Sequence, residues 1–219
     1  MILYLVGVEH EATRFRQVRG FTENNLIFID VIESAIRKCS FDLLAEEEQA
    51  ECLIKYSAIS LLDAIHRAHG IHHQFVDPNS REREIIGYRD DREILELEEF
   101  KAQISDPMLA KDANCGDEIE KIAYAHLITH QFPRRERFWL RELKKTNAEK
   151  VLFVCGDIHI RTFPKLLASV GIESEVIKEG VGVDNSMIEY RAFEFADSNN
   201  MFSQTDCFCL EKLPVDQMS

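Results

Sequence analysis

Short runs of apolar residues recur along the chain and alternate with longer segments whose apolar residues are spaced three or four positions apart. Runs of the first kind are typical of buried strands, and segments of the second kind are typical of amphipathic helices. The runs that predict strands are Ile2 to Val6, Phe41 to Ala45, Ile71 to Val76, Val151 to Val154 and Glu173 to Ile177. The segments that predict helices are Thr22 to Cys39, Ala50 to Gly70, Glu118 to Gln131, Arg135 to Lys145 and Thr162 to Val170. This alternation predicts an α/β fold with a mostly parallel central sheet and helices on both of its faces.

The residues at the ends of these segments refine the prediction. Thr22 is a candidate N-cap, and Gly70 suits the left-handed residue that ends many helices. Pro133 predicts a break between two helices, because the residue before a proline is biased away from helix. The stretch Asn25 to Asp30 is apolar and β-branched enough to leave a strand open as the alternative there.

No repeat, low-complexity tract or Pro/Gly-rich linker divides the chain, so we expect residues 1–219 to form a single α/β domain. The stretch from Ser80 to Asp117 is highly charged and poorly periodic, which is typical of either an exposed helix or a mobile loop, and we expect a charged helical insertion at about 80–145. The segment at about 180–219 predicts a less regular C-terminal tail.

Composition narrows the expected partners and location. The net charge is −13, which disfavours nucleic acid and an anionic membrane, since both require clustered Lys and Arg. The first apolar run is far too short for a signal peptide or a membrane span, and the six cysteines form no Cys-x-x-Cys pair, as is typical of reduced thiols. We therefore expect a cytoplasmic protein that acts on a small-molecule or peptide substrate; a homo-oligomer stays open.

The motif Gly-x-x-His occurs twice, from Gly7 to His10 and from Gly156 to His159, each time directly after a predicted strand. Parallel strands end at a shared edge where ligands bind, and glycine allows either a positive φ or a close backbone approach at the strand exit. The two histidines are therefore predicted to converge on one metal ion or one substrate. The alternative is that both are hydrogen-bonded crevice residues.

An acidic cluster, Glu46 to Glu48, ends the strand predicted between the two motifs. Strand alternation sends Glu46 and Glu47 to opposite sides, so only one of them is expected to serve as a ligand or general base. Two imidazoles and one carboxylate, here His10, His159 and Glu47, form a ligand set for Zn, Mn or Co. The alternative is an acidic first turn that favours the helix after it.

Two further groups supply candidate cations and hydrogen-bonding side chains. Arg135 and Arg137 precede apolar residues on a predicted helix, where one guanidinium could bind a carboxylate or an oxyanion. Asp77 and Arg81 follow the third predicted strand and are candidate substrate-binding residues. The alternative for the arginines is a solvated basic start of a helix.

Several histidines lie outside these motifs. They are spaced for a shared helical face or lie close together in sequence: His66, His69, His72 and His73, with His126 and His130 further on. Neither helical pair has a carboxylate in the register of a metalloprotease helix, so surface or interface histidines are the favoured interpretation.

The paired Gly-x-x-His motifs, the acidic strand end and the arginine helix between them together resemble the TIKI/TraB superfamily, which includes erythromycin-esterase-like (EreA-like) and ChaN-like proteins. The resemblance covers about residues 1 to 177, in order. It implies a hydrolase, peptidase-like or esterase-like, that depends on a divalent metal (Mn, Co or Zn). His10 and His159 would be metal or catalytic histidines, Glu46 or Glu47 a ligand or general base, and Arg135 an oxyanion or substrate clamp. The family's arginine is usually followed by Asp or Asn, whereas Glu136 follows here, so Arg137 competes for that role.

Two other functions stay open. One is a metal-independent esterase of small molecules, in which one histidine acts as general base. The other is a non-enzymatic ligand-sensing or toxin-like module that binds a small molecule in the same crevice.

Overall fold

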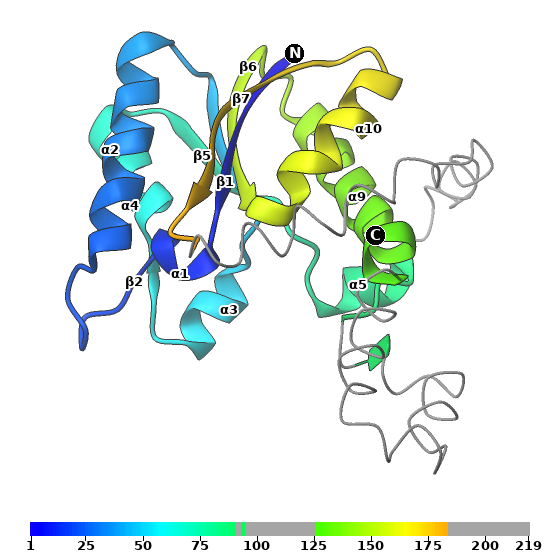
Figure 1. Ribbon diagram of the computed structural model, residues 1–219, viewed down its shortest axis with the longest axis horizontal. Coiled ribbons are helices and arrows are strands. Elements are labelled where there is room, and N and C mark those ends of the chain that lie inside the picture. The colour runs from blue at the N-terminus through cyan, green and yellow to red at the C-terminus, as the bar shows by residue number, and fades with distance from the viewer. Residues whose placement is uncertain (91–92, 95–125, 184–219) are drawn as a thin grey trace, which may run out of the picture.

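The computed structural model describes residues 1–90, 93–94 and 126–183 (Figure 1). At its centre is a five-stranded sheet in the order β5-β3-β6-β1-β7, in which all paired strands are parallel. Its strands are β1 (Ile2–Val8), β3 (Leu43–Glu46), β5 (His72–Phe75), β6 (Lys150–Gly156) and β7 (Glu173–Val181). The predicted α/β class and parallel sheet are confirmed.

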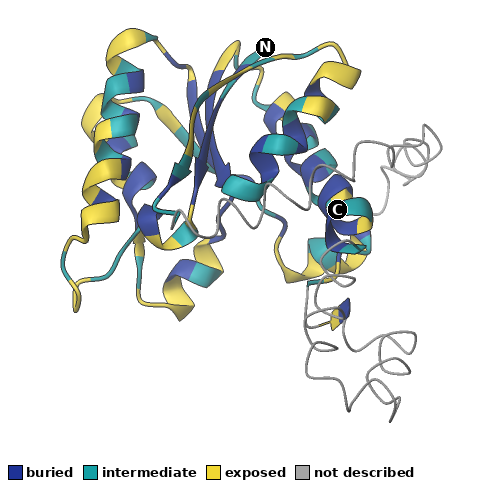
Figure 2. Cartoon of the chain, viewed as in Figure 1, coloured by how far each residue is buried: buried dark blue, intermediate teal, exposed yellow. Residues whose placement is uncertain are grey.

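Helices cover both faces of this sheet. Helices α2 (Glu23–Lys38) and α4 (Leu61–His69) lie on one side, and α9 (Phe132–Lys145) and α10 (Phe163–Ser169) lie on the other (Figure 1). Alternate strand residues supply the two apolar layers: Leu3 and Leu5 pack toward α9 and α10, whereas Val6 and Val8 pack toward α2 and α4. Strands β1 and β6 are therefore buried along most of their length (Figure 2).

Short elements fill the connections. They are α1 (His10–Thr13), β2 (Arg14–Phe15), α3 (Ala50–Lys55), β4 (Ile59–Ser60), α5 (Ser80–Ile86), the π-helix η2 (Leu127–Gln131) and the 3-10 helix η3 (Asp157–Arg161). Strands β2 and β4 pair antiparallel as a separate two-stranded sheet. None of the helices in the described ranges is long and apolar enough to span a membrane.

The helix predicted from Ala50 to Gly70 is in fact two helices, α3 and α4, separated by β4. Ser57 adopts a positive φ of 49°, which no helix accommodates, and Ser60 starts α4 by accepting a hydrogen bond from the Asp63 N–H. Gly70 ends α4 in the left-handed conformation, as predicted.

The break predicted at Pro133 is also wrong. The π-helix η2 continues directly into α9, and Pro133 lies just after the point where the π-helix passes into the α-helix, with Gln131 and Phe132 before it both in the right-handed helical conformation. Thr22 does cap α2, in a reciprocal capping box with Asn25, and Asn25 to Asp30 is helix rather than strand.

The insertion predicted at 80–145 falls partly outside the described residues, which include α5, η2 and α9 from it. The tail predicted at 180–219 and most of the helix predicted from Glu118 to Gln131 also lie outside them.

Candidate functional site

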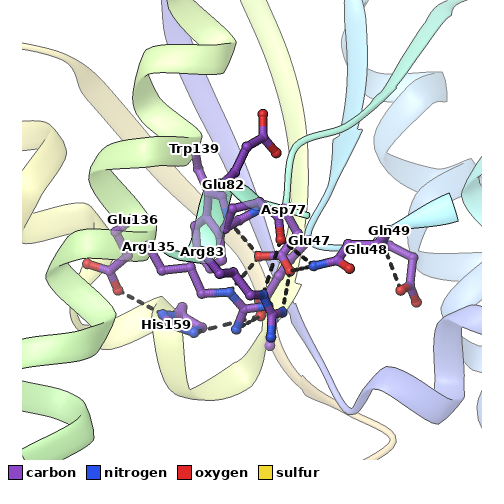
Figure 3. Close-up of polar contacts among 12 residues, drawn as sticks. Glu47, Glu48, Gln49, Asp77, Glu82, Arg83, Arg135, Glu136, Trp139 and His159 are labelled. Atoms are coloured by element: carbon purple, nitrogen blue, oxygen red, sulfur yellow. Dashed lines mark hydrogen bonds and ion pairs between the residues drawn. The ribbon is translucent and has the colours of Figure 1, made fainter. Parts of the chain in front are cut away.

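Glu47 lies at the centre of a buried polar cluster at the carboxyl edge of the sheet (Figure 3). Its Oε1 is 2.6 Å from Arg135 Nη1, 3.6 Å from His10 Nε2 and 3.8 Å from His159 Nε2. Its Oε2 accepts a hydrogen bond of 2.7 Å from the N–H of Gly156. Both Gly-x-x-His segments and the acidic strand end therefore meet at one carboxylate.

The two motif glycines serve close approach rather than positive φ. Neither Gly7 nor Gly156 is among the positive-φ glycines, and Gly156 has a φ of −54°. A Cβ on Gly156 would lie 3.3 Å from His10 Nε2 and 3.4 Å from Glu47 Oε2. A Cβ on Gly7 would overlap Ile160 and would lie 2.7 Å from the carboxylate oxygen Oδ1 of Asp157. The second of the two roles predicted for these glycines is the one that the structure shows.

The two histidines differ in environment. His10 begins α1, directly beyond β1, and its side chain is 38% exposed, whereas the Glu47 side chain is 1% exposed. His159 lies on η3 and is buried, with its ring against Phe132 and Trp139. His10 is therefore the imidazole that solvent and a ligand can reach.

His159 is held in place by a buried carboxylate from α9. Its Nδ1 is 2.8 Å from Glu136 Oε1, and the Thr162 hydroxyl donates to the same oxygen. Because a carboxylate only accepts, this contact places a proton on Nδ1 and directs Nε2 of His159 toward Glu47.

Arg135 bridges two buried carboxylates. Besides Glu47 it contacts Asp77, with 2.5 Å between its Nε and Asp77 Oδ1 (Figure 3). Other donors complete the shell of Asp77: Trp139 Nε1 at 3.0 Å, and Arg83 Nη2 and Gln49 Nε2 each at 2.9 Å. The bridge thus joins three segments: the end of β3, the bend that follows β5, and α9.

The charges of this cluster reinforce one another. Burial alone would raise the pKa of Glu47, but Arg135, His159 and His10 outweigh it and hold that pKa well below its usual range. Arg135 in the same way lowers the pKa of Asp77 against the effect of burial. Burial lowers the pKa of His10, yet the Glu47 carboxylate opposes it more strongly, and the pKa of His10 is raised. At neutral pH both carboxylates are therefore ionised.

The divalent metal implied by the family resemblance does not fit His10, His159 and Glu47 as they are arranged. Both oxygens of Glu47 already accept hydrogen bonds, and the Arg135 guanidinium occupies the oxygen that the two imidazoles face. In the described part of the chain, the one group of three His, Cys, Asp or Glu side chains with ligand atoms within 4.8 Å of one another lies elsewhere. The cluster at Glu47 is better suited to acid–base chemistry than to holding a cation.

The other predicted site residues are placed as follows. Glu46 points to the opposite face of the sheet, where the Ser60 hydroxyl donates to it at 2.5 Å. Arg137 is half-buried two positions beyond Arg135, which is the arginine paired with Glu47. Arg81 is exposed on α5, and Arg83 contacts Asp77 in its place.

Sequence reasoning missed several partners of this cluster: Gln49, Arg83, Glu136 and Trp139 as a donor. Glu136 did carry a signal, because it is spaced i, i+3, i+4 and i+7 with Trp139, Leu140 and Leu143, the buried face of α9. An acid on an apolar helix face requires a buried partner, and here that partner is His159.

Comparisons with models of known protein families, with curated proteins and with solved structures find no match to this chain. The chemistry of the site is therefore what bears on function.

Proposed function

We propose that the chain is a hydrolase of small esters or lactones in which His10 acts as general base without a metal ion. The observation that carries this proposal is the accessible imidazole of His10 beside the buried, ionised carboxylate of Glu47, 3.6 Å away. An imidazole backed by a carboxylate is an effective base, because the carboxylate fixes the ring and stabilises the imidazolium that forms. The raised pKa of His10 also moves it toward neutral pH, where proton transfer is most effective.

In this mechanism the negative charge of Glu47, 3.6 Å from Nε2 of His10, favours the proton on that nitrogen, and Nδ1 takes a proton from a water molecule. The water oxygen forms a bond to the carbonyl carbon of the substrate, and the protonated His10 then returns a proton to the leaving alkoxide as the ester C–O bond breaks. Glu47 stabilises the imidazolium between these two steps. Arg135 acts as a positioning residue, because it keeps Glu47 ionised and is bonded to both buried carboxylates.

The test is hydrolysis of a panel of p-nitrophenyl esters and lactones by the full chain, with and without EDTA. We expect turnover that EDTA leaves unchanged, and a loss of about 10²–10⁴-fold in kcat/KM in His10→Ala, the usual contribution of a general base. The matched control is His69→Ala, which removes an imidazole on α4 that is paired with Glu33, away from Glu47. The metal-dependent hydrolase would be favoured instead if EDTA abolished turnover and Mn²⁺, Co²⁺ or Zn²⁺ restored it. The same result in His66→Ala, which removes a histidine of the other candidate metal cluster, would place that metal at the Glu47 cluster. No hydrolysis of any ester, lactone or peptide would overturn both.

A further inference from the structure

A second polar cluster lies on the other face of the sheet, between α4 and β5. Asp63 and His66 project from α4, and His73 comes from β5. His66 Nε2 is 3.1 Å and His73 Nδ1 is 3.5 Å from the same oxygen, Asp63 Oδ1. The two imidazole rings are stacked, with centroids 5.2 Å apart. Three ligand atoms from two elements thus converge on one point.

The opposite nitrogen of each ring is bonded to an acceptor. His66 Nδ1 is 3.0 Å from the Ile71 carbonyl, and His73 Nε2 is 2.7 Å from Glu46 Oε1. In the neutral rings these nitrogens carry the protons, so the nitrogens that face Asp63 are lone pairs. A nitrogen lone pair and a carboxylate oxygen repel each other at this distance. A proton on the nitrogen, or a cation between the nitrogens and the oxygen, removes that repulsion. This pattern, in which each ligand histidine donates its other N–H to a carbonyl or carboxylate, is typical of metal sites.

We propose that Asp63 Oδ1, His66 Nε2 and His73 Nδ1 bind a zinc ion, with water as the fourth ligand. Two imidazoles and one carboxylate form a usual tetrahedral zinc set, with bonds of about 2.0–2.2 Å that place neighbouring ligand atoms about 3.4 Å apart. The 3.1 and 3.5 Å separations lie close to that spacing.

Charge and exposure also suit a dication at this point. The Glu46 carboxylate contacts the far nitrogen of His73, and the Asp63 carboxylate adds a second negative charge. Arg67 contacts Oδ2 of Asp63 and leaves Oδ1 to face the two histidines. His73 is 5% exposed and His66 is 26% exposed, so the ion would be held from the protein side and reached from solvent.

This ion would fasten α4 to β5, a strand at the edge of the sheet. It would be separate from the Glu47 cluster, because Glu46 and Glu47 point to opposite faces. Its three ligands take no part in the hydrolysis proposed above, so the two proposals are independent.

The test is titration of the chelator-treated full chain with Zn²⁺ by calorimetry, together with thermal unfolding. We expect one Zn²⁺ per chain and, at about 100 times Kd, a rise in Tm of roughly 5–10 °C. His66→Ala should abolish this binding, and Glu46→Gln, which alters only the outer partner of His73, should weaken it about 10–100-fold. Co²⁺ bound in place of Zn²⁺ should show the intense visible bands of tetrahedral coordination.

The controls separate this site from the other histidines. His69→Ala, one turn further along α4, and His10→Ala, in the Glu47 cluster, should both keep the affinity of the unaltered chain. The absence of stoichiometric Zn²⁺ binding by the unaltered chain would overturn the proposal and leave protonated histidines as the explanation of the contacts. Unchanged binding by His66→Ala, or loss of binding in His10→Ala instead, would overturn it as well.

Discussion

Glu46 and Glu47 are adjacent in sequence and serve different polar clusters on opposite faces of the sheet. Successive side chains at the end of a strand point to opposite sides. Glu46 therefore contacts Ser60 and His73 on the side of α4, and Glu47 contacts Arg135 on the side of α9. A shift of β3 by one residue would exchange the two carboxylates and disrupt both clusters.

Glu47→Gln tests the electrostatic coupling to His10. The neutral imidazole is the active base, so kcat/KM falls as the pH drops through its pKa, which Glu47 raises. Removal of the negative charge lowers that pKa, and the acid limb of the pH profile should move to lower pH while kcat decreases. Glu46→Gln is the control, since that carboxylate lies on the other face, and its acid limb should not move. An acid limb that stays in place in Glu47→Gln would exclude His10 as the titrating base.

The two motif glycines should respond differently to alanine. In Gly7→Ala the new Cβ would overlap Ile160 and lie 2.7 Å from Asp157 Oδ1, so η3 must shift, at a cost of roughly 1–3 kcal/mol of unfolding free energy. In Gly156→Ala the contacts, at 3.3 and 3.4 Å, are with His10 and Glu47, so we expect a smaller loss of stability and a clear loss of kcat/KM. Urea unfolding and ester hydrolysis measure the two effects. An equal loss of stability in both variants would contradict this reasoning.

The position of the site could be predicted from the sequence. The contacts between the side chains of the Glu47 cluster could be predicted only in part. Because parallel strands end at one edge, the order of motifs was enough to bring His10, His159 and Glu47 together. Arg83 rather than Arg81 contacts Asp77, because Arg83 lies on the same face of α5 as the buried Ile86, whereas Arg81 is exposed. Positive φ was one expectation for the glycines, but close approach is what requires them: η3 packs against Gly7, and the side chains of His10 and Glu47 pack against Gly156.

At the scale of elements, the breaks between helices were the hardest feature to predict. The apolar spacing from Ala50 to Gly70 continues across β4, and the left-handed residue that interrupts it is Ser57, which is not a typical residue for that conformation. Pro133, in contrast, is a typical breaker that does not end the helix here, because it lies at the junction where the π-helix η2 passes into α9. Periodicity located the helical faces and could not locate these boundaries.

Ser60→Ala should cost more than an ordinary loss of a helix cap. The Ser60 hydroxyl accepts from the Asp63 N–H at the start of α4 and donates to the buried Glu46 carboxylate. Loss of the cap costs about 1 kcal/mol, and the missing donor to a buried carboxylate adds about 1–2 kcal/mol. Asn79→Ala removes the cap of the short helix α5 at an exposed position and is the control, with a loss of about 1 kcal/mol. Chemical unfolding measures both, and equal losses would show that Glu46 does not depend on Ser60.

At the scale of the whole molecule, buried ion pairs join elements that also share apolar packing. The apolar core divides into two layers, one on each side of the sheet. At the carboxyl edge, Arg135 on α9 bonds Glu47 beyond β3 and Asp77 beyond β5. The alternation of strands and helices predicted the class of fold, yet the order β5-β3-β6-β1-β7 was not predicted, because it depends on which strands pair across the sheet.

Arg135→Met should destabilise the protein most at neutral pH. In the unaltered chain the pKa values of Glu47 and Asp77 lie below their ordinary values, so their contribution to stability is present above about pH 4 and is lost as the pH falls through the folded-state pKa values. Without the guanidinium, burial is no longer outweighed at either carboxylate, and both pKa values rise. The free energy of unfolding at pH 7 should fall by about 3–5 kcal/mol, as for other buried ion pairs that lose one partner.

The loss of stability in Arg135→Met should depend on pH. Protonation of Glu47 and Asp77 in the variant relieves the unpaired charges, so the difference between the two proteins should shrink as the pH is lowered from 7 toward 4. Urea unfolding at a series of pH values measures it, and Arg81→Met, which removes an exposed arginine from α5, should follow the unaltered chain throughout. A deficit that stays constant with pH would mean that Arg135 stabilises the fold by packing against Trp139 rather than by its charge, since its guanidinium also lies 5.2 Å from that ring.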